Sequence, residues 1–173
     1  MKRIADVLNG AGVVYAVGGS MLLKIHGLVE RANDVDLIVR EEDAVRAHEA
    51  LLGIGTGERG QAKEPYRTRH FYVHEADGTS IDLIGGFRIA HESGVYEYPF
   101  GQDSVSGREP VPLCALEDWY VLYQLMAGKE EKLAAMEAHF AKHGIARPDL
   151  LRHALERELP IRVRVRVESL LRG

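Results

Sequence analysis

The sequence predicts an α/β fold in which a mixed, twisted sheet is flanked by helices and followed by a helical C-terminal part. Short apolar or alternating runs, which are typical of strands, recur at 13–17, 34–39, 69–74 and 79–84. Segments with helical spacing of apolar residues separate the first of these runs. After Pro110 and Pro112 only helical spacing remains, so we expect a core over 1–109 and a helical region over 110–173.

The first forty residues predict two helices and two strands. An amphipathic helix ends at Asn9-Gly10, and the β-branched run at 13–17 predicts a buried strand. Gly18-Gly19 then turns the chain, and Ser20 can cap a helix that stops at Gly27. The next strand, 34–39, alternates its side chains. Three apolar residues face one side of the sheet, and two aspartates face the other.

The middle of the chain predicts a helix, a connector and a hairpin. The helix begins near Glu41, and its expected inner stripe is Val45, His48, Leu51 and Leu52. Residues 53–65 hold four glycines and predict a loose connector, with a substrate lid as the alternative. The strands 69–74 and 79–84 flank the turn Asp77-Gly78 and form a hairpin that carries Asp82. A further short strand is expected at 95–98.

Helices are predicted at 116–126, 133–140 and 148–159. The last segment, 160–173, is ambiguous, because its valines alternate with arginines as in a strand and also fit a helix. We favour a helix, since three helices precede it. The arginines could contact nucleic acid or an acidic partner, but a solvated helix face is the preferred interpretation.

Composition excludes several classes of protein. The formal net charge of −4 provides no overall field that would attract polyanions. The single cysteine, Cys114, excludes an intramolecular disulfide and any zinc cluster built from cysteines. No apolar stretch reaches the roughly 18–20 residues that span a bilayer, and the N-terminus lacks the apolar core of a signal peptide. We therefore expect a cytoplasmic protein with no membrane partner.

Three carboxylates are placed for metal-dependent phosphoryl chemistry. Asp34 and Asp36 lie two residues apart on one strand, so their Cα atoms are roughly 6.6 Å apart on the same face. Asp82 occupies the matching phase of its own strand. Three acids gathered together repel one another unless a cation joins them, and ligands that are all oxygen favour Mg²⁺ or Mn²⁺ over zinc.

The glycine turn predicts a place for phosphate. Gly18 and Gly19 have no side chains, so backbone N–H groups could approach phosphate oxygens. Ser20 adds a hydroxyl, and the helix behind it presents its positive end. Arg31, three residues before Asp34, could pair with phosphate in a bidentate manner.

Taken together, Gly18-Gly19-Ser20 and Arg31-Ala32-Asn33-Asp34-Val35-Asp36-Leu37 resemble the signature of the DNA polymerase β-like nucleotidyltransferase superfamily. The resemblance covers roughly residues 13–86 and is similar to small bacterial members, which include lincosamide and aminoglycoside nucleotidyltransferases and nucleotidyltransferase toxins. It implies that Asp34 and Asp36 bind two metals. It also implies that Asp82 binds the catalytic metal and helps activate the acceptor hydroxyl, and that Gly18-Gly19-Ser20 holds a nucleoside triphosphate such as ATP.

Two places on the later helices depart from the family pattern. Many relatives carry a lysine where Gln124 stands, and a Lys-Asp pair where this chain has Glu131-Lys132; Lys129 lies nearby and could substitute. The expected function is transfer of a nucleoside monophosphate to a hydroxyl or phosphate acceptor, either a small molecule or RNA. The alternatives are a catalytically degenerate module that binds nucleotide or protein, and a toxin-like enzyme acting on tRNA. The sequence leaves the oligomeric state open; a homodimer is one of the expected states, since small relatives often complete a pocket with a second subunit.

Overall fold

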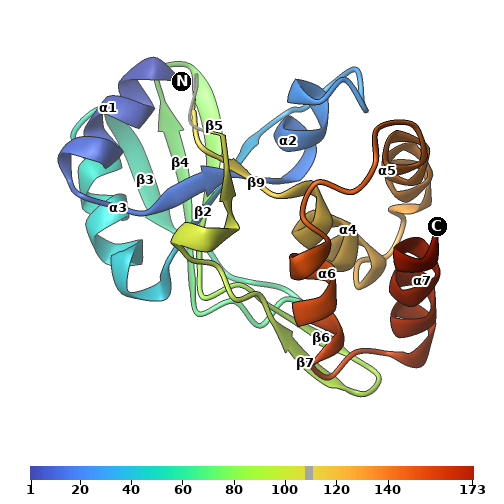
Figure 1. Cartoon of the computed structure of the whole chain (residues 1–173). Coiled ribbons are helices and arrows are strands. Elements are labelled where there is room, and N and C mark those ends of the chain that lie inside the picture. The colour runs from blue at the N-terminus through green and yellow to red at the C-terminus, as the bar shows by residue number, and fades with distance from the viewer. Residues whose placement is uncertain (108–110) are drawn as a thin grey trace.

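The computed structural model describes residues 1–107 and 111–173, and in it a mixed sheet of seven strands forms the centre of the molecule (Figure 1). The strands run in the order β3-β4-β5-β2-β1-β9-β8. Their bounds are β1 (Tyr15–Val17), β2 (Val35–Val39), β3 (Gly55–Arg59), β4 (His70–Ala76), β5 (Thr79–Gly85), β8 (Val105–Ser106) and β9 (Leu113–Cys114). β2–β5 and β1–β9 are parallel, whereas the other neighbours are antiparallel. The predicted mixed sheet is confirmed.

Two further strands form a separate hairpin sheet, and helices cover both faces of the large one. The hairpin consists of β6 (Arg88–His91) and β7 (Gly94–Glu97), so the strand expected at 95–98 is present one residue earlier. The helices are α1 (Lys2–Gly10), α2 (Gly19–Ile25), α3 (Ala44–Leu52), α4 (Leu116–Gln124), α5 (Glu130–His143), α6 (Pro148–Leu155) and α7 (Ile161–Arg172), with single 3₁₀ turns η1 (Glu41–Asp43) and η2 (Gln102–Ser104). Among the described residues, no helix has both the length and the apolar character needed to cross a membrane.

The alternation of side chains in β2 divides the interior into two cores. Val35, Leu37 and Val39 belong to the core under α1 and α3. Ile38 belongs to the other core, which lies under α2 and α4. Asp36, between Leu37 and Val35 in the chain, shares the face of Ile38 because successive side chains point to opposite sides. The carboxylates therefore lie on the face of the sheet that the C-terminal helices cover.

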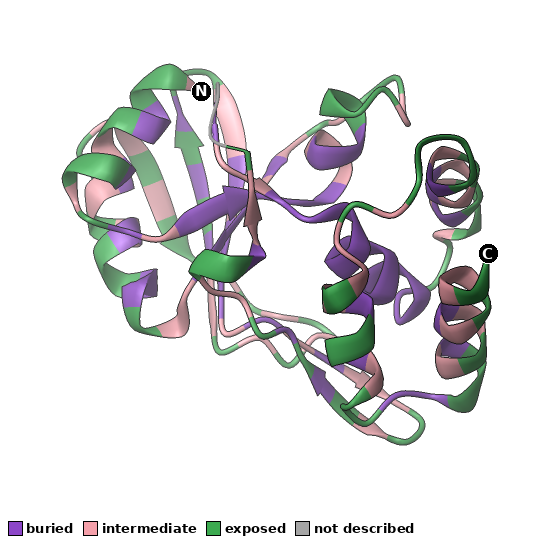
Figure 2. Cartoon of the chain, in the orientation of Figure 1, coloured by how far each residue is buried: buried purple, intermediate pink, exposed green. Residues whose placement is uncertain are grey.

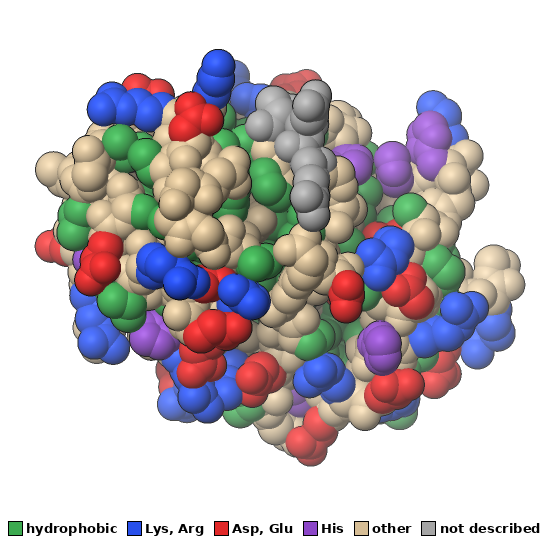
Figure 3. All heavy atoms as spheres, turned by 60° about the vertical axis from the view of Figure 1, so that its left-hand side comes forward, with side chains coloured by type: hydrophobic (Ala, Val, Ile, Leu, Met, Phe, Trp, Pro, Cys, Tyr) green, Lys and Arg blue, Asp and Glu red, His purple; other side chains and the backbone are tan. Residues whose placement is uncertain are grey.

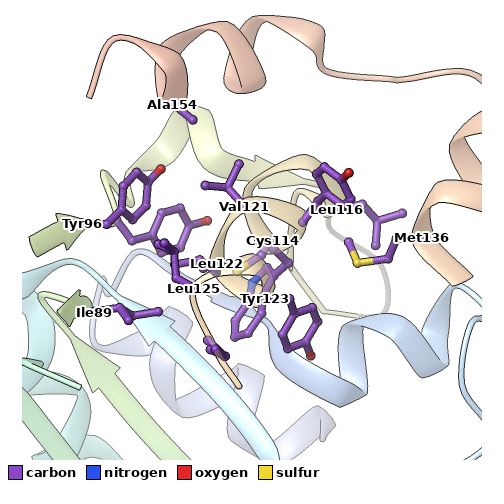
Figure 4. Close-up of a cluster of buried hydrophobic side chains, with 14 of the residues drawn as sticks. Ile89, Tyr96, Cys114, Leu116, Val121, Leu122, Tyr123, Leu125, Met136 and Ala154 are labelled. Carbon is purple, nitrogen blue, oxygen red and sulfur yellow. The ribbon is translucent and has the colours of Figure 1, made fainter. Parts of the chain in front are cut away.

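Helix α4 connects the sheet to the C-terminal helices. All nine of its residues are buried, as Figure 2 shows, and it contacts α2, α5, α6 and α7. Figure 4 shows its side chains in one cluster with Tyr96 of β7, Met136 of α5 and Ala154 of α6. The core of the helical region is thus continuous with that of the sheet. The boundary predicted between residues 109 and 110 lies outside the described residues.

The stretch predicted as a loose connector begins with a strand, β3, and this part of the prediction is wrong. β3 pairs antiparallel with β4 over its whole length. A Cβ at Gly55 would overlap the carbonyl oxygen of Glu75, and one at Gly57 would overlap the ring of His74. The glycines therefore allow the two strands to approach closely. The sequence prediction interpreted the same glycines as a sign of a flexible connector. Only the residues after β3 connect it to β4.

The predicted inner stripe of α3 is also wrong in two of its four positions. Val45 and Leu52 are 48% and 43% exposed, while Ala44, Ala47 and Leu51 are buried. The helix begins after the turn η1, and its small alanines let it lie close to the sheet. Side chains larger than alanine at these positions would hold the helix further from the sheet. The size of the apolar side chains therefore did not identify the buried face of α3.

The ambiguous C-terminal segment is the helix α7, as we favoured. Three of its arginines bond to other helices. Arg162 donates to a carbonyl oxygen at the end of α4 (2.8 Å), and Arg164 donates to one at the end of α6 (2.7 Å). Arg166 forms an ion pair with Glu137 of α5 (2.7 Å). These arginines hold the helices together.

A buried carboxyl group lies in the first turn of α4. Asp118 accepts a hydrogen bond from the Tyr98 hydroxyl at 3.0 Å and is 5% exposed. Burial raises the pKa of Asp118 to about 7, although the Tyr98 hydrogen bond opposes the shift. In the unfolded chain this pKa is about 3.9. Between these values the folded protein keeps a proton that the unfolded chain has lost, so stability falls as pH rises through this window.

Asp118→Asn is therefore expected to raise the free energy of unfolding at about pH 8 by about 2 kcal/mol. The amide has no proton to lose, and its oxygen still accepts from Tyr98. Urea denaturation of both proteins at about pH 8 and about pH 4.5 measures the effect. The gain should shrink at the lower pH, because folded Asp118 is then neutral like the asparagine and the pH lies close to the pKa of the unfolded carboxyl group. An equal gain at both values would show that ionisation of Asp118 is not its cause.

Candidate active site

The structure brings the three predicted carboxylates together. Asp36 on β2 and Asp82 on β5 stand opposite each other in the parallel register. Neighbouring strands are about 4.8 Å apart, so these side chains leave the same face of the sheet side by side. Asp34 comes one residue before β2. All three carboxylates line one cavity of about 420 Å³.

The negative charges of these carboxylates repel one another. Burial raises the pKa of Asp36 to about 7, and the negative charges of Asp34 and Asp82 add to this shift. The pKa of Asp82 is also raised, by burial and by Asp34. Lys132 and Lys129 offset part of the effect at Asp36. A cation beside these groups would favour their ionised forms.

The donor set fits a hard divalent cation. All three donors are carboxylates, which suit Mg²⁺ or Mn²⁺. Within residues 1–107 and 111–173, no three His, Cys, Asp or Glu side chains are arranged so that they could together hold a metal ion. Mg²⁺ typically takes one or two carboxylates and fills its other positions with water and substrate phosphates. A Mg²⁺ ion in this cavity would therefore take most of its ligands from water and phosphate.

The glycine turn makes room for neighbouring side chains. Gly19 has φ +59°, and a Cβ there would overlap the Oδ2 atom of Asp36. A Cβ at Gly18 would overlap the ring of Trp119. The N–H of Gly18 donates to the Asp36 carbonyl oxygen at 2.9 Å. These two glycines thus position Asp36 and Trp119, a role that sequence reasoning did not assign. Gly19 and Ser20 line the cavity.

Two of the positive charges at the cavity come from α5 and the residue before it. The Lys132 ammonium donates to Ser20 Oγ at 2.6 Å, and Lys129 lines the same cavity. Gln124, at the position where relatives carry lysine, is buried, and its amide donates to the Tyr120 carbonyl oxygen at 3.2 Å. Sequence reasoning named Lys129 as a substitute but missed Lys132. Their spacing of three residues at a helix start was the available clue.

Arg31 lies apart from this group. It is exposed, and it is not among the residues that line the cavity. Its predicted contact with phosphate has no support in this geometry. The lysines of α5 occupy the place at the cavity that the prediction gave to Arg31.

The rest of the wall includes aromatic side chains that come from two directions. Trp119 and Tyr123 line the cavity from α4. Tyr66 and Phe71 line it from the connector between β3 and β4 and from β4 itself. Gln61, Lys63 and Thr68 of the same connector also face it. The connector is thus part of the cavity wall.

No protein-family model matches the chain, and neither does any curated protein. Solved structures do match it. A nucleotidyltransferase of inferred function from Thermotoga maritima gives a TM-score of 0.61 at 22% identity, over 82% of this chain and 90% of that one. ANT(2'')-Ia in complex with adenylyl-2''-tobramycin gives 0.55 at 10% identity, over 96% and 94%. The solution structure of ANT(2'')-Ia gives 0.54 at 13% identity, over 89% and 88%.

These similarities, together with the carboxylate strands, define the class of fold. The chain shares the fold of these nucleotidyltransferases, which is the fold that the resemblance implied. Identities this low establish the fold alone, so the chemistry has to be argued from the residues in the cavity.

Proposed function

We propose that the protein is a Mg²⁺-dependent nucleotidyltransferase that uses a nucleoside triphosphate as donor. The observation that carries the proposal is the register of Asp36 against Asp82, with Asp34 at the same cavity and with Ser20 and Lys132 beside it. Asp34, Asp36 and Asp82 would hold the metal, which would stabilise charge on the transferring phosphoryl group. Gly19, Ser20 and the lysines of α5 would bind the triphosphate.

The proposed reaction moves a nucleoside monophosphate to an acceptor hydroxyl. The acceptor oxygen forms a bond to the α-phosphorus as the bond to the β-phosphate oxygen breaks, and pyrophosphate leaves. The hydroxyl proton passes to a carboxylate oxygen of Asp82 and then to water. Lys132 and Lys129 would compensate the negative charge of the departing pyrophosphate. The departure at Gln124 therefore does not argue against activity, because other lysines supply the charge.

Calorimetric titration with each nucleoside triphosphate and Mg²⁺, followed by a pyrophosphate-release assay with an acceptor panel, tests the proposal. Tobramycin belongs in the panel because ANT(2'')-Ia is seen with its adenylylated form. We expect binding and release of pyrophosphate. If the triphosphate binds but no acceptor leads to release of pyrophosphate, the result would instead support the alternative function, a nucleotide-binding module without catalytic activity.

Lys132→Met is expected to raise the KM for the triphosphate about tenfold, since one charge-assisted contact to phosphate is worth about 1.5 kcal/mol. Methionine keeps the apolar part of the side chain and removes the ammonium group. Lys142→Met, on the same helix but outside the cavity, is the matched control and should leave KM unchanged. If Lys132→Met and Lys142→Met have equal KM values, Lys132 does not bind the triphosphate.

A further inference from the structure

The cavity has two ends, on either side of the carboxylates. β5, β2 and β1 are neighbours in that order. The next position across the sheet after Asp82 on β5 and Asp36 on β2 belongs to Ser20, which lies in the first turn of α2, just beyond the end of β1. Lys132 contacts Ser20 at this end. On the other side of β5 lies β4, where residues 61–68 enter the cavity. If the triphosphate occupies the Ser20 end, an acceptor must approach Asp82 from the 61–68 end.

The charges at the acceptor end are unsuited to a polycation. Among the described residues, the only carboxylates that line the cavity are Asp34, Asp36 and Asp82. Once these bind metal, no acid remains there to pair with an ammonium group. Lys63, at the acceptor end, is exposed and forms no ion pair within the described residues. An acceptor with several ammonium groups would meet Lys63 without compensation.

The same end offers flat apolar surfaces. Tyr66 and Phe71 line the cavity and are only half-buried. Tyr66 stacks on Phe87, with ring centroids 6.2 Å apart, which holds its ring in place. Aromatic faces of this kind stack on nucleobases without strong preference for sequence. Outside the cavity, acidic and basic side chains are interspersed over the face drawn in Figure 3, and no single sign dominates it.

We propose that the acceptor is a phosphate-bearing molecule with a planar base: a nucleotide, either free or at the end of an RNA strand. Its hydroxyl lies at Asp82, its base lies against Tyr66 and Phe71, and its phosphate pairs with Lys63. This proposal rests on the proposed function and specifies the acceptor that it left open.

The first test compares acceptors in the wild-type protein. Labelled ATP and Mg²⁺ are incubated with AMP, with a short single-stranded RNA that has a free 3′ hydroxyl, or with tobramycin. We expect label on AMP or on the RNA and none on tobramycin; the labelled arm identifies the source of the nucleotide. Transfer to tobramycin at an equal or higher rate would overturn the acceptor assignment and leave the transferase intact. Triphosphate binding with no label on AMP or RNA would also overturn the assignment. No binding and no pyrophosphate release in any arm would overturn both.

The second test concerns Lys63. Lys63→Glu should raise the KM for the labelled acceptor about tenfold through charge repulsion, and Lys63→Arg should restore it. Lys2→Glu, on α1 and away from the cavity, is the matched control and should have no effect. The effect of Lys63→Glu should also weaken as salt is added. A KM unchanged by Lys63→Glu, or one that Lys63→Arg fails to restore, would remove Lys63 from the acceptor site.

Discussion

Asp36→Asn should be more stable than the wild-type protein and yet transfer nucleotide about 10³-fold more slowly. In the free protein, the Asp36 carboxylate lies partly buried near Asp34 and Asp82, and this environment disfavours its charge. The amide removes that repulsion, so we expect about 1–2 kcal/mol of added stability at about pH 8. The amide also removes a metal ligand. Losing about 4 kcal/mol of transition-state stabilisation would reduce the rate about 10³-fold.

Thermal unfolding with and without Mg²⁺ and ATP, together with a transfer assay, measures both effects. The wild-type protein should gain stability from Mg²⁺ and ATP, and Asp36→Asn should gain little. Asp6→Asn, on the exposed side of α1, serves as the control and should behave like the wild type. A variant that retains turnover would remove Asp36 from the mechanism. A variant that is less stable than the wild type would contradict the account of carboxylate repulsion.

Gly19→Ala should lose both activity and stability. Gly19 has a positive φ, which costs a non-glycine residue roughly 1–2 kcal/mol. The added Cβ would also overlap the Oδ2 atom of Asp36, so the carboxyl group must move. A displacement of about 1 Å at a reacting centre costs about 10²-fold in rate. The melting temperature and the transfer rate should therefore both fall.

Gly10→Ala is the matched control, because no atom lies within 4 Å of a Cβ there. It should leave the transfer rate unchanged and should not lower the melting temperature, because alanine favours a helix more than glycine does. The comparison with Asp36→Asn separates two roles: both variants lose activity, but their stabilities shift in opposite directions. Full activity in Gly19→Ala would show that the turn does not constrain Asp36.

The carboxylate arrangement could be predicted because it depends on local periodicity. The alternation of 34–39 and of 79–84 determines which side chains share a face, and parallel pairing of β2 with β5 then brings Asp36 opposite Asp82. Lys132 could not be predicted in this way. It meets Ser20 across 112 residues of sequence, through the packing of α5 against α4. No local pattern reports a contact of that kind.

The errors have a common physical origin. The glycines of β3 and the alanines of α3 are small because a neighbouring strand or the sheet lies close to them. From the sequence alone, the glycines of β3 suggest a flexible connector, and the alanines of α3 suggest a face that points away from the core. In both cases the structure depends on the distance from the element to the neighbouring strand or sheet. That distance is defined only in the folded chain.

The two aromatic walls of the cavity differ in how far they belong to the buried core. Trp119 and Tyr123 belong to α4, whose residues are all buried, so changes there would disturb the whole interior. The opposite wall is a connector whose Gln61, Lys63 and Arg67 are exposed and support little of the core. Selection could exchange this second wall while leaving the first untouched. A lineage with this architecture can therefore acquire new acceptors at small cost in folding.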